Sequence, residues 1–593
     1  MNLTPVSVAL VSLLAVASAS GASAACQFQK IADVPVTMEG LRPTIMAKIN
    51  GQDAKFLVDT GAFFSGVTTD TAGKYGLKHS IAPFGWKLQG VGGVSRDMQA
   101  VAAESFVFAG MGFRNADFVV IGRVGGDLVG NIGENLMGPF DVEYDLANGV
   151  MRYFKATGCG YDANLAYWSA GLPVSRLSII EPTTILTRVI TTAKVDDHSI
   201  RVMFDSGSSL SAMSRTAAGR AGIKVTSDGV VSGGISYGIF GKGLETFLAP
   251  FASFKIGEEE IKNTRLRVAD IELPGGDMLL GADFFLSHRI LISNSQKKVY
   301  FTYNGGPVFR LDQVGRVQAQ AAPAAGGSEP KTGAEFARRA AGLAARRDYL
   351  PAIADYTRAI ALEPDVARNY RARATVRLAV RQTLPALDDL NEALKRDPSD
   401  SEALMLRGRV ALAMGEPVKA KVDFDMAIKL APADPDLMAS IGVVYAQAGL
   451  YEPAIHALDG WIVSHPKSED MAQVLNARCY TRGVWGRELD LALADCDAAL
   501  KKDRVSAIMD SRALVLLRMG RLDEAIAQYG AAIKAQPGGA DSLYGRGLAE
   551  LKKGQKAEGE ADMAAAKAIS PGIDKQFQKF GLAPDGPPPA AKS

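Results

Sequence analysis

The sequence carries one short module twice, and this duplication constrains the fold more than any other feature. An apolar stretch runs into Asp-Thr-Gly at residues 56–61, and a second one runs into Asp-Ser-Gly at residues 202–207. A segment that alternates apolar and polar residues and then turns precedes each copy, at residues 44–51 and 187–197. Such alternation followed by a turn signal predicts a β-hairpin. The repeated order of hairpin, strand and aspartate-bearing turn predicts two related all-β lobes.

Two further features accompany each copy of the module. Glycine-rich segments follow at residues 88–93 and 231–235, and each is a candidate for a second hairpin. Two apolar residues and a glycine come later in both copies, at residues 128–130 and 279–281. With these features, the chain resembles the retropepsin-like aspartic protease family, in which the later glycine turn packs beneath the catalytic loop and the glycine-rich hairpin is a flap. The resemblance implies that one chain supplies both lobes that a retroviral enzyme assembles as a homodimer.

The resemblance assigns a role to each residue of the two turns. Asp59 and Asp205 are the expected catalytic pair. Thr60 and Ser206 are expected to hold the two loops together through hydroxyl hydrogen bonds. Glycine is expected beside the carboxylates, where a side chain would crowd them, and in the flaps. The glycines in these positions are Gly61 and Gly207 in the loops, and Gly90, Gly92, Gly93, Gly233 and Gly234 in the flaps.

A pair of adjacent carboxylates has a defined chemistry. Two carboxylates about 3 Å apart repel one another by on the order of 5 kcal/mol, so the pair holds one proton and titrates as a unit. The ionised member takes a proton from a water that attacks the peptide carbonyl, and the protonated member donates to the oxyanion and then to the leaving amine. We expect no metal and no organic cofactor. The chain has no Cys-x-x-Cys motif and its five histidines are scattered, so nothing supports a metal site.

The last part of the chain repeats every 34 residues. Prolines mark the period, with Pro364, Pro398, Pro432 and Pro466 evenly spaced and Pro537 and Pro571 again 34 residues apart. Small and aromatic residues recur at fixed offsets before these prolines, as at Gly408 and Phe424. The pattern resembles tetratricopeptide repeats, helix–turn–helix units that stack into a superhelix. We expect about seven units with an irregular fifth, and a protein or peptide partner on the concave face.

These patterns predict a multidomain chain, with an all-β bilobal retropepsin-like acid protease domain followed by an all-α tetratricopeptide-repeat solenoid. The Ala/Pro/Gly-rich stretch between them predicts a flexible linker. The expected segments are a signal peptide at 1–25, lobe 1 at 26–160, lobe 2 at 161–305, the linker at 306–332, the repeats at 333–572 and a disordered tail at 573–593.

The N-terminus indicates export. Residues 6–17 are apolar and are followed by small residues up to residue 25, the pattern of a secretory signal peptide and its cleavage site. The apolar run is shorter than the about 20 residues that a membrane span needs. We therefore expect a periplasmic or secreted protein with no stable membrane span after cleavage. A retained anchor and a lipoprotein modified at Cys26 are the alternatives.

Four cysteines fit an oxidising compartment. A bridge between Cys26 and Cys159 would tie together the two ends of lobe 1 and contribute roughly 2–4 kcal/mol. Cys479 and Cys496 fall on successive expected helices, where they either pair or remain buried thiols.

Charge and motifs argue against other function classes. A net charge of +2 gives no reason to expect a nucleic-acid partner. The chain lacks a Gly-x-Ser-x-Gly elbow, and the glycines at 90–93 lack the Lys-Ser/Thr of a phosphate-binding loop. We predict an aspartic endopeptidase whose repeat array recruits a polypeptide substrate or partner. The alternatives are a non-catalytic exported scaffold whose β domain only binds, and two chains that pair lobe to lobe.

Overall fold

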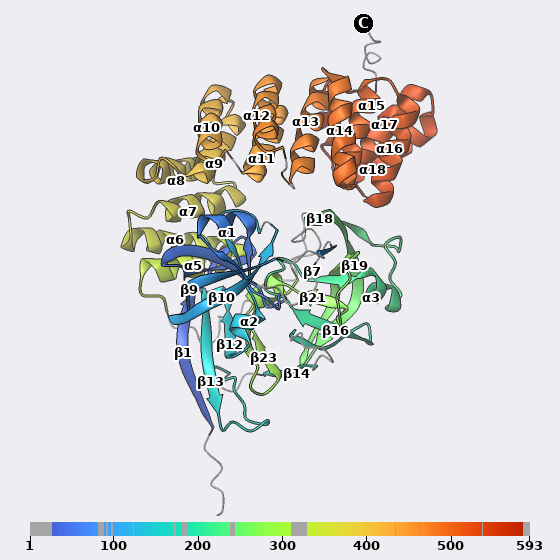
Figure 1. The fold of residues 1–593 in the computed structure, drawn as a ribbon. Coiled ribbons are helices and arrows are strands. Elements are labelled where there is room, and N and C mark those ends of the chain that lie inside the picture. The colour runs from blue at the N-terminus through green and yellow to red at the C-terminus, as the bar shows by residue number, and fades with distance from the viewer. Residues whose placement is uncertain are drawn as a thin grey trace, which may run out of the picture.

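A computed structural model describes residues 26–584, with gaps at 81–87, 91–92, 96–98, 123, 170–172, 181–187, 238–242, 310–328, 433, 467, 469 and 537. Two β lobes lie side by side, and a helical array arches over them (Figure 1). The predicted signal peptide at 1–25 and most of the predicted linker lie outside the described residues. The fold class matches the prediction from sequence, because both lobes are all-β and the array is all-α.

Each lobe is built on one sheet that curls into a barrel, because its first hairpin also pairs with a later long strand (β3 with β9, β15 with β19). The lobe 1 sheet has the order β2 (Thr37–Glu39), β3 (Arg42–Ile49), β4 (Gln52–Val58), β11 (Gly130–Ile132), β5 (Gly66–Thr68), β10 (Met111–Ile121), β9 (Ala100–Phe108) and β6 (Lys78–Ser80). The lobe 2 sheet has the order β15 (Ile190–Val195), β16 (His198–Phe204), β21 (Met278–Leu280), β17 (Ala212–Ser214), β20 (Glu259–Ala269), β19 (Gly243–Ile256) and β18 (Val231–Tyr237). Short helices α1 (Thr69–Lys74), α2 (Glu134–Met137), α3 (Arg215–Arg220) and α4 (Ala282–Ser287) complete the lobes.

A third sheet joins the lobes. Its order is β1 (Gln27–Pro35), β13 (Val150–Thr157), β12 (Asp141–Asp145), β22 (His288–Ser293), β23 (Lys298–Tyr303) and β14 (Ser175–Ser178). The first three strands come from lobe 1 and the last three from lobe 2. The lobes meet where β12 pairs with β22, with Val142 opposite Ile292. The backbone ladder therefore continues from one lobe into the other.

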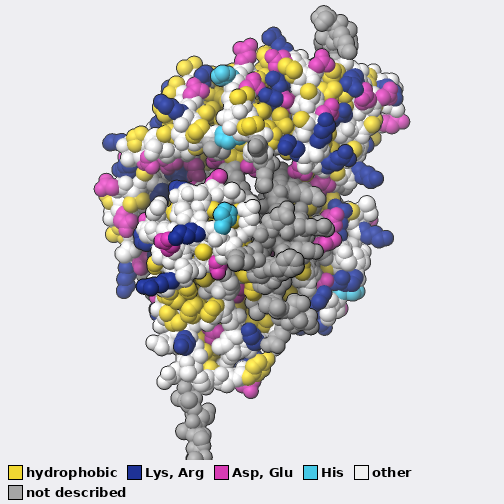
Figure 2. Space-filling model, viewed as in Figure 1, with side chains coloured by type: hydrophobic (Ala, Val, Ile, Leu, Met, Phe, Trp, Pro, Cys, Tyr) yellow, Lys and Arg dark blue, Asp and Glu magenta, His cyan; other side chains and the backbone are white. Residues whose placement is uncertain are grey.

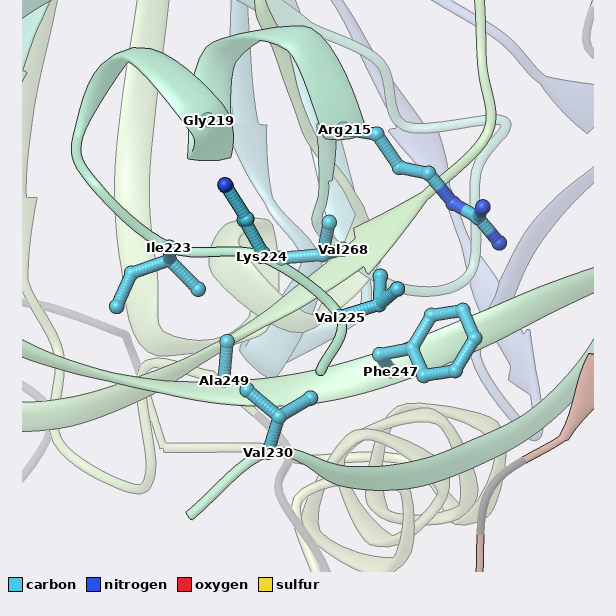
Figure 3. A pocket seen from close by; sticks show the side chains of 9 residues that line it. All are labelled: Arg215, Gly219, Ile223, Lys224, Val225, Val230, Phe247, Ala249 and Val268. Atoms are coloured by element: carbon cyan, nitrogen blue, oxygen red, sulfur yellow. The ribbon is translucent and has the colours of Figure 1, made fainter. Parts of the chain in front are cut away.

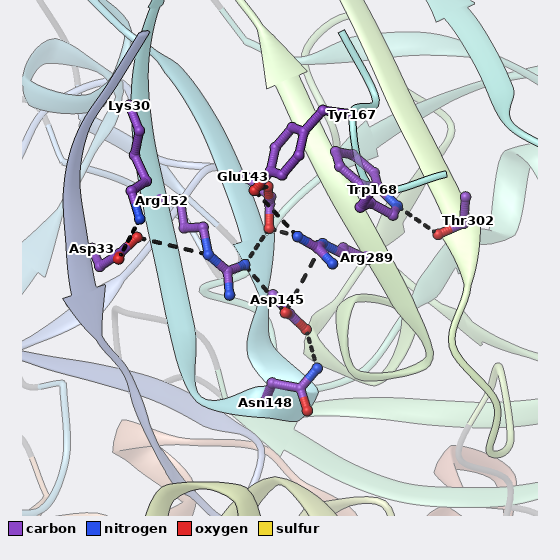
Figure 4. Close-up of polar contacts among 10 residues, drawn as sticks. All are labelled: Lys30, Asp33, Glu143, Asp145, Asn148, Arg152, Tyr167, Trp168, Arg289 and Thr302. Carbon is purple, nitrogen blue, oxygen red and sulfur yellow. Dashed lines mark hydrogen bonds and ion pairs between the residues drawn. The ribbon is translucent and has the colours of Figure 1, made fainter. Parts of the chain in front are cut away.

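A buried charge network lies at this junction (Figure 4). Glu143 and Asp145 are fully buried on β12, and two guanidinium groups neutralise them. Arg289 of lobe 2 donates through Nε to Glu143 Oε1 at 2.8 Å, and Arg152 of lobe 1 contacts both carboxylates. Tyr167 donates to the second oxygen of Glu143 at 2.7 Å, and burial beside that carboxylate raises the pKa of Tyr167 to about 12. The network therefore crosslinks the lobes by charge as well as by backbone.

The array consists of seven helix pairs followed by one short helix. In order, the pairs are α5 (Gly333–Ala345) and α6 (Tyr349–Leu362), α7 (Ala367–Ala379) and α8 (Thr383–Arg396), α9 (Ser401–Ala413) and α10 (Pro417–Leu430), α11 (Pro435–Gln447) and α12 (Tyr451–Ser464), α13 (Met471–Trp485) and α14 (Leu489–Lys502), α15 (Ser506–Arg518) and α16 (Leu522–Ala535), and α17 (Ala540–Lys553) and α18 (Lys556–Ile569). Glycine lets the helices of a pair approach closely. A Cβ at Gly408 would lie 2.5 Å from the ring of Phe424 on the facing helix.

Partly buried ion pairs recur in the array, and they were not predicted from the sequence. In five of the pairs an arginine on the first helix meets an aspartate on the second. These pairs are Arg339–Asp355, Arg373–Asp389, Arg407–Asp423, Arg478–Asp495 and Arg546–Asp562. The spacing is 16 residues except in the fifth unit, where it is 17, which matches its irregular sequence. The recurring pair fixes the two helices of a unit in one register.

The array touches the two β lobes at both of its ends. Ala341 and Ala345 of α5 belong to the same hydrophobic core as the lobes, and Gly342 lies so close to Ala147 that a Cβ would be 2.6 Å from the Ala147 carbonyl oxygen. At the far end, Gln536 donates to Ser232 Oγ on β18 at 2.7 Å. The backbone amide of Ser506 donates to Glu245 on β19 at 3.2 Å. The array therefore spans both lobes.

The prediction of a disordered tail from residue 573 was wrong in its first part. Residues Ile573–Lys579 form helix α19, and Ile573 and Phe577 are buried against the last repeat. These apolar side chains cover the end of the core that the repeats leave open, which a superhelical array requires. The rest of the predicted tail, from residue 585, lies outside the described residues.

The four cysteines form two disulfides in the structure. Cys26 pairs with Cys159 with an S–S distance of 2.13 Å, and Cys479 pairs with Cys496 with an S–S distance of 1.98 Å. The first bond links the segment before β1 to the segment after β13, and the second links α13 to α14. Both pairings agree with the partners considered from sequence.

Replacing Arg289 with Met is expected to destabilise the protein by about 3–5 kcal/mol, because two fully buried carboxylates would then share one guanidinium. Urea-induced unfolding measures the change. Lys48→Met is the control, because Lys48 and its partner Asp53 are exposed and such a pair contributes at most about 1 kcal/mol. Equal unfolding midpoints for the two variants would show that the buried network does not hold the lobes together.

Candidate active site

The two aspartates of the duplicated module occupy equivalent places in the two lobes. Asp59 directly follows β4 and Asp205 directly follows β16. In each lobe a parallel neighbour strand fixes the turn, because the aspartate amide donates to the last residue of that strand. The distances are 3.0 Å from Asp59 N to the carbonyl oxygen of Ile132 and 2.9 Å from Asp205 N to that of Leu280. The backbone thus places the two aspartates at equivalent positions in their lobes.

Four hydrogen bonds cross between the two loops. Thr60 Oγ1 donates to the carbonyl oxygen of Phe204 at 2.9 Å, and Ser206 Oγ donates to that of Val58 at 2.8 Å. Each hydroxyl oxygen also accepts from the opposite backbone amide, at 3.0 Å from Ser206 N and 3.2 Å from Thr60 N. Both residues are completely buried. The reciprocal bonds hold the lobes in one relative position at the point where the aspartates meet.

The glycine after each hydroxyl residue lies against the opposite aspartate. A Cβ at Gly61 would lie 2.4–2.7 Å from the carboxyl atoms of Asp205, and a Cβ at Gly207 would lie 2.4–2.8 Å from those of Asp59. Only glycine leaves this space open. The two carboxyl groups are therefore adjacent, and they hydrogen-bond to one another.

The surroundings raise the pKa of both carboxyl groups. Burial is the largest cause for Asp59, and the charge of Asp205 adds to it, so the pKa of Asp59 lies well above its usual range. Burial also raises the pKa of Asp205, against the opposing effect of backbone amides such as that of Ser208, which donates to Oδ1 at 3.1 Å. A pair with raised pKa values retains a shared proton, which is the condition for acid–base work by two carboxyl groups.

The structure corrects the expected glycine turn of lobe 1 by three residues. In lobe 2, Gly281 donates its amide to a serine hydroxyl at 2.9 Å, and the residue that makes the same bond in lobe 1 is Gly133 rather than Gly130. Gly133 was not identified from the sequence, because Asn131 stands where lobe 2 has the apolar Leu279. Asn131 is buried and donates through Nδ2 to Asp59 Oδ2 at 3.2 Å. The two aspartates therefore have different neighbours.

A serine beneath each loop connects the aspartate-bearing turn to the glycine turn. Ser65 and Ser211 lie six residues after the two aspartates and are buried. Each serine donates through both its amide and its hydroxyl to a single side-chain oxygen. The acceptor is Asn135 Oδ1 in lobe 1 and Asp283 Oδ1 in lobe 2. Sequence reasoning missed both serines, although their equal offset from the aspartates was a usable signal.

The glycine-rich segments form hairpins, as far as they are described. In lobe 1, Gly90 of β7 (Leu88–Gly90) pairs with Gly93 of β8 (Gly93–Ser95), and Gly92 lies outside the described residues. In lobe 2, β18 contains Gly233 and Gly234 and pairs with β19 through a bulge at these glycines. A Cβ at Gly233 would lie 2.7 Å from Thr246 Oγ1, and Gly234 has a φ of +81°, so both positions require glycine.

A cavity of about 200 Å³ in lobe 2 lies apart from the two aspartates (Figure 3). Apolar side chains such as Val225, Phe247 and Val268 line it, with Arg215 and Lys224 among the remaining lining residues. Neither aspartate contributes to it, so it is not the place where the carboxyl pair would act. In the described part of the chain, no cluster of three or more His, Cys, Asp or Glu side chains could hold a metal ion.

Family models match both halves of the chain. A model described as aspartyl protease matches residues 45–138 and 191–284, and a model described as tetratricopeptide repeat matches residues 371–435 and 511–572. The chain therefore carries an aspartyl protease domain in its N-terminal half and tetratricopeptide repeats in its C-terminal half. Each segment that matches the first model contains one of the two aspartates.

Similar solved structures are found for the array. A tetratricopeptide repeat protein from Parabacteroides merdae is 18% identical and covers 42% of this chain and 98% of its own, with a TM-score of 0.36. Yeast Tom70 is 17% identical and covers 42% of this chain and 54% of its own, with a TM-score of 0.33. A search of curated proteins found no match.

Replacing Asp59 with Asn is expected to stabilise the protein at neutral pH. Since the folded state raises the pKa of Asp59 well above 3.8, the folded protein binds this proton more tightly than the unfolded chain. The resulting stability is complete below about pH 3.8 and is lost as the pH rises through the folded-state pKa. Thermal unfolding should therefore show a higher midpoint for Asp59→Asn than for the wild type at pH 7.5, and a smaller difference at pH 3.5. The same difference at both pH values would refute the raised pKa.

Proposed function

We propose that the chain is an aspartic endopeptidase in which Asp59 and Asp205 activate a water for attack on a peptide bond. The adjacency of the two carboxyl groups carries the proposal. They hydrogen-bond to one another, they sit on loops locked by Thr60 and Ser206, and their pKa values are raised. A pair of turn-capping aspartates in a binding domain would have no need of this arrangement.

The two carboxyl groups act together as acid and base. Burial raises the pKa of both, so the pair holds one proton, with one member protonated and the other ionised. The ionised member takes a proton from the water as the water oxygen bonds to the peptide carbon, and the protonated member gives its proton to the carbonyl oxygen. When the carbon–nitrogen bond breaks, the leaving amine takes the proton that came from the water, and one hydroxyl of the intermediate returns its proton to the pair, so a carboxyl product forms and the pair again holds one proton. The loop glycines leave room for the reacting groups between the carboxyls.

The array is proposed to recruit the polypeptide that is cleaved. Its far end contacts the β18–β19 hairpin of lobe 2, so a chain held there lies next to the lobe that carries Asp205. Hydrophobic side chains gather on the array in Figure 2. On α10 the residues at every fourth position, Val418, Val422, Met426 and Leu430, are 40–78% exposed. Exposed apolar surface of this kind suits a partner that presents apolar side chains, such as an unfolded chain.

Export to an oxidising compartment, the periplasm or the cell exterior, is also proposed. Two disulfides support it, because such bonds persist where thiols are not kept reduced. None of the helices that the structure describes is long and apolar enough to cross a membrane.

Asp59→Asn and Asp205→Asn, each alone, are expected to lower kcat/KM for cleavage of a denatured protein by about 10³-fold or more, because acid and base are each required. Peptide products are quantified by mass spectrometry at acidic to neutral pH. Asp53→Asn, on the strand that leads to Asp59, is the matched control, because Asp53 is exposed and lies at the opposite end of β4 from the loop. Cleavage that survives either catalytic substitution would refute the proposal and favour the non-catalytic scaffold.

Recruitment by the array predicts that KM depends on substrate length. A denatured protein should have a KM about tenfold or more below that of an eight-residue peptide with the same cleavage site, at similar kcat, because a second attachment raises the local concentration of the scissile segment. Steady-state kinetics on the full chain measure both parameters. Equal KM values for the two substrates would show that the array does not recruit substrate.

A further inference from the structure

Each lobe begins its first hairpin with an arginine at the same distance from its aspartate. Arg42 and Arg188 precede Asp59 and Asp205 by 17 residues each. The antiparallel registers of β3 with β4 and of β15 with β16, continued by two residues, place each arginine opposite its aspartate. In lobe 2 the amide of Phe204 donates to the carbonyl oxygen of Val189 at 3.0 Å, so the observed register reaches the residue next to Arg188. Both arginines therefore start beside the catalytic loops.

The two arginine side chains have different surroundings. Arg42 donates through Nη1 to the carbonyl oxygen of Val124 at 3.4 Å, and its guanidinium packs over Gly125 and Gly126 of its own lobe. Arg188 is half-buried, and its buried Nε has no hydrogen-bond partner. With respect to the residues that the structure describes, its side chain forms no ion pair.

Arg188 lies within electrostatic reach of the carboxyl pair. Burial lowers the pKa of Arg188, and the charges of Asp205 and Asp59 oppose this lowering. Conversely, Arg188 is among the groups that counteract the raised pKa of Asp205. The strand register also places Arg188 opposite Asp205, so the guanidinium is close to the place where a scissile peptide must lie.

A buried N–H of a guanidinium that has no acceptor costs free energy, unless a bound group supplies the acceptor. The carboxyl pair does not do so, since it holds one proton and no hydrogen bond from Arg188 reaches it among the described residues. The planar fork of arginine matches a carboxylate. A substrate carboxylate near the pair would otherwise be repelled by its negative charge, and the neighbouring cation offsets that repulsion.

We propose that Arg188 determines substrate specificity by binding the carboxylate of an aspartate or glutamate side chain close to the scissile bond. The inference rests on the proposed peptidase function. Arg42 supplies no equivalent contact, because its own lobe already holds its guanidinium. The preference for an acidic side chain therefore comes from lobe 2 alone, although the strands that position the two arginines are equivalent in both lobes.

Matched peptides that differ only in Glu or Gln, at each position within three residues of a cleaved bond, test the inference. The ratio of kcat/KM for the Glu and Gln peptides should be about 10–100 at one position in the wild type, the value of a charge-assisted hydrogen bond. Arg188→Gln should bring this ratio to about 1, and Arg188→Glu should favour a Lys peptide over the Glu peptide. Arg42→Gln is the matched control and should leave the ratio unchanged.

The other possible results decide against either the inference or the proposed function. A ratio that survives Arg188→Gln, or a wild-type ratio of 1 at every position, would overturn the inference while leaving the peptidase proposal intact. If Arg188 acts only on the charge of the pair, Arg188→Gln would change both peptides by the same factor, which also overturns it. If the wild type cleaves no peptide, the proposed function fails. Fluorescence anisotropy with the same peptides then decides the inference, which stands only if the wild type binds the Glu peptide more tightly and Arg188→Gln does not.

Discussion

The reciprocal hydrogen bonds between Thr60 and Ser206 are the interaction on which the rest of the site depends. Each hydroxyl donates to a carbonyl and accepts from an amide of the other lobe. Both residues are fully buried, and these bonds supply each hydroxyl with a donor and an acceptor. A shift of either lobe would leave buried polar groups unpaired, which is costly. The bonds thereby force two carboxyl groups into contact, although their mutual repulsion and burial oppose this. The shared β sheet and the buried network around Glu143 resist separation on the opposite side.

A symmetric backbone here carries asymmetric side chains. Equivalent strands, turns and hydrogen bonds position Asp59 and Asp205, but Asn131 faces Asp59 where lobe 2 has Leu279. Arg188 remains near the pair, whereas its counterpart is held elsewhere. Two carboxyl groups in identical surroundings would share acid and base roles equally. Here the neighbours are unequal, so the two carboxyl groups lie in different surroundings.

Much of the fold was predictable from the sequence, because duplication and a 34-residue period are visible without tertiary information. The aspartates and their hydroxyl neighbours lie inside the duplicated module, so their position followed directly. Gly133 was missed because the polar Asn131 interrupts the apolar pattern that marks the turn. The docking of α5 on lobe 1 was missed because Ala341 and Gly342 also suit an ordinary repeat. Contacts between distant segments leave no periodic trace in a sequence.

The central claim is that Asp59 and Asp205 share one proton, and carbon-13 NMR titration of labelled aspartate carboxyl groups tests it most directly. The account predicts that Asp59 titrates well above 3.8 in the wild type, and that its pKa falls in the Asp205→Asn variant because the charge of the partner is removed. Some elevation should remain in that variant, since burial is the larger cause. Independent titration of both aspartates near 3.8 in the wild type would contradict the account.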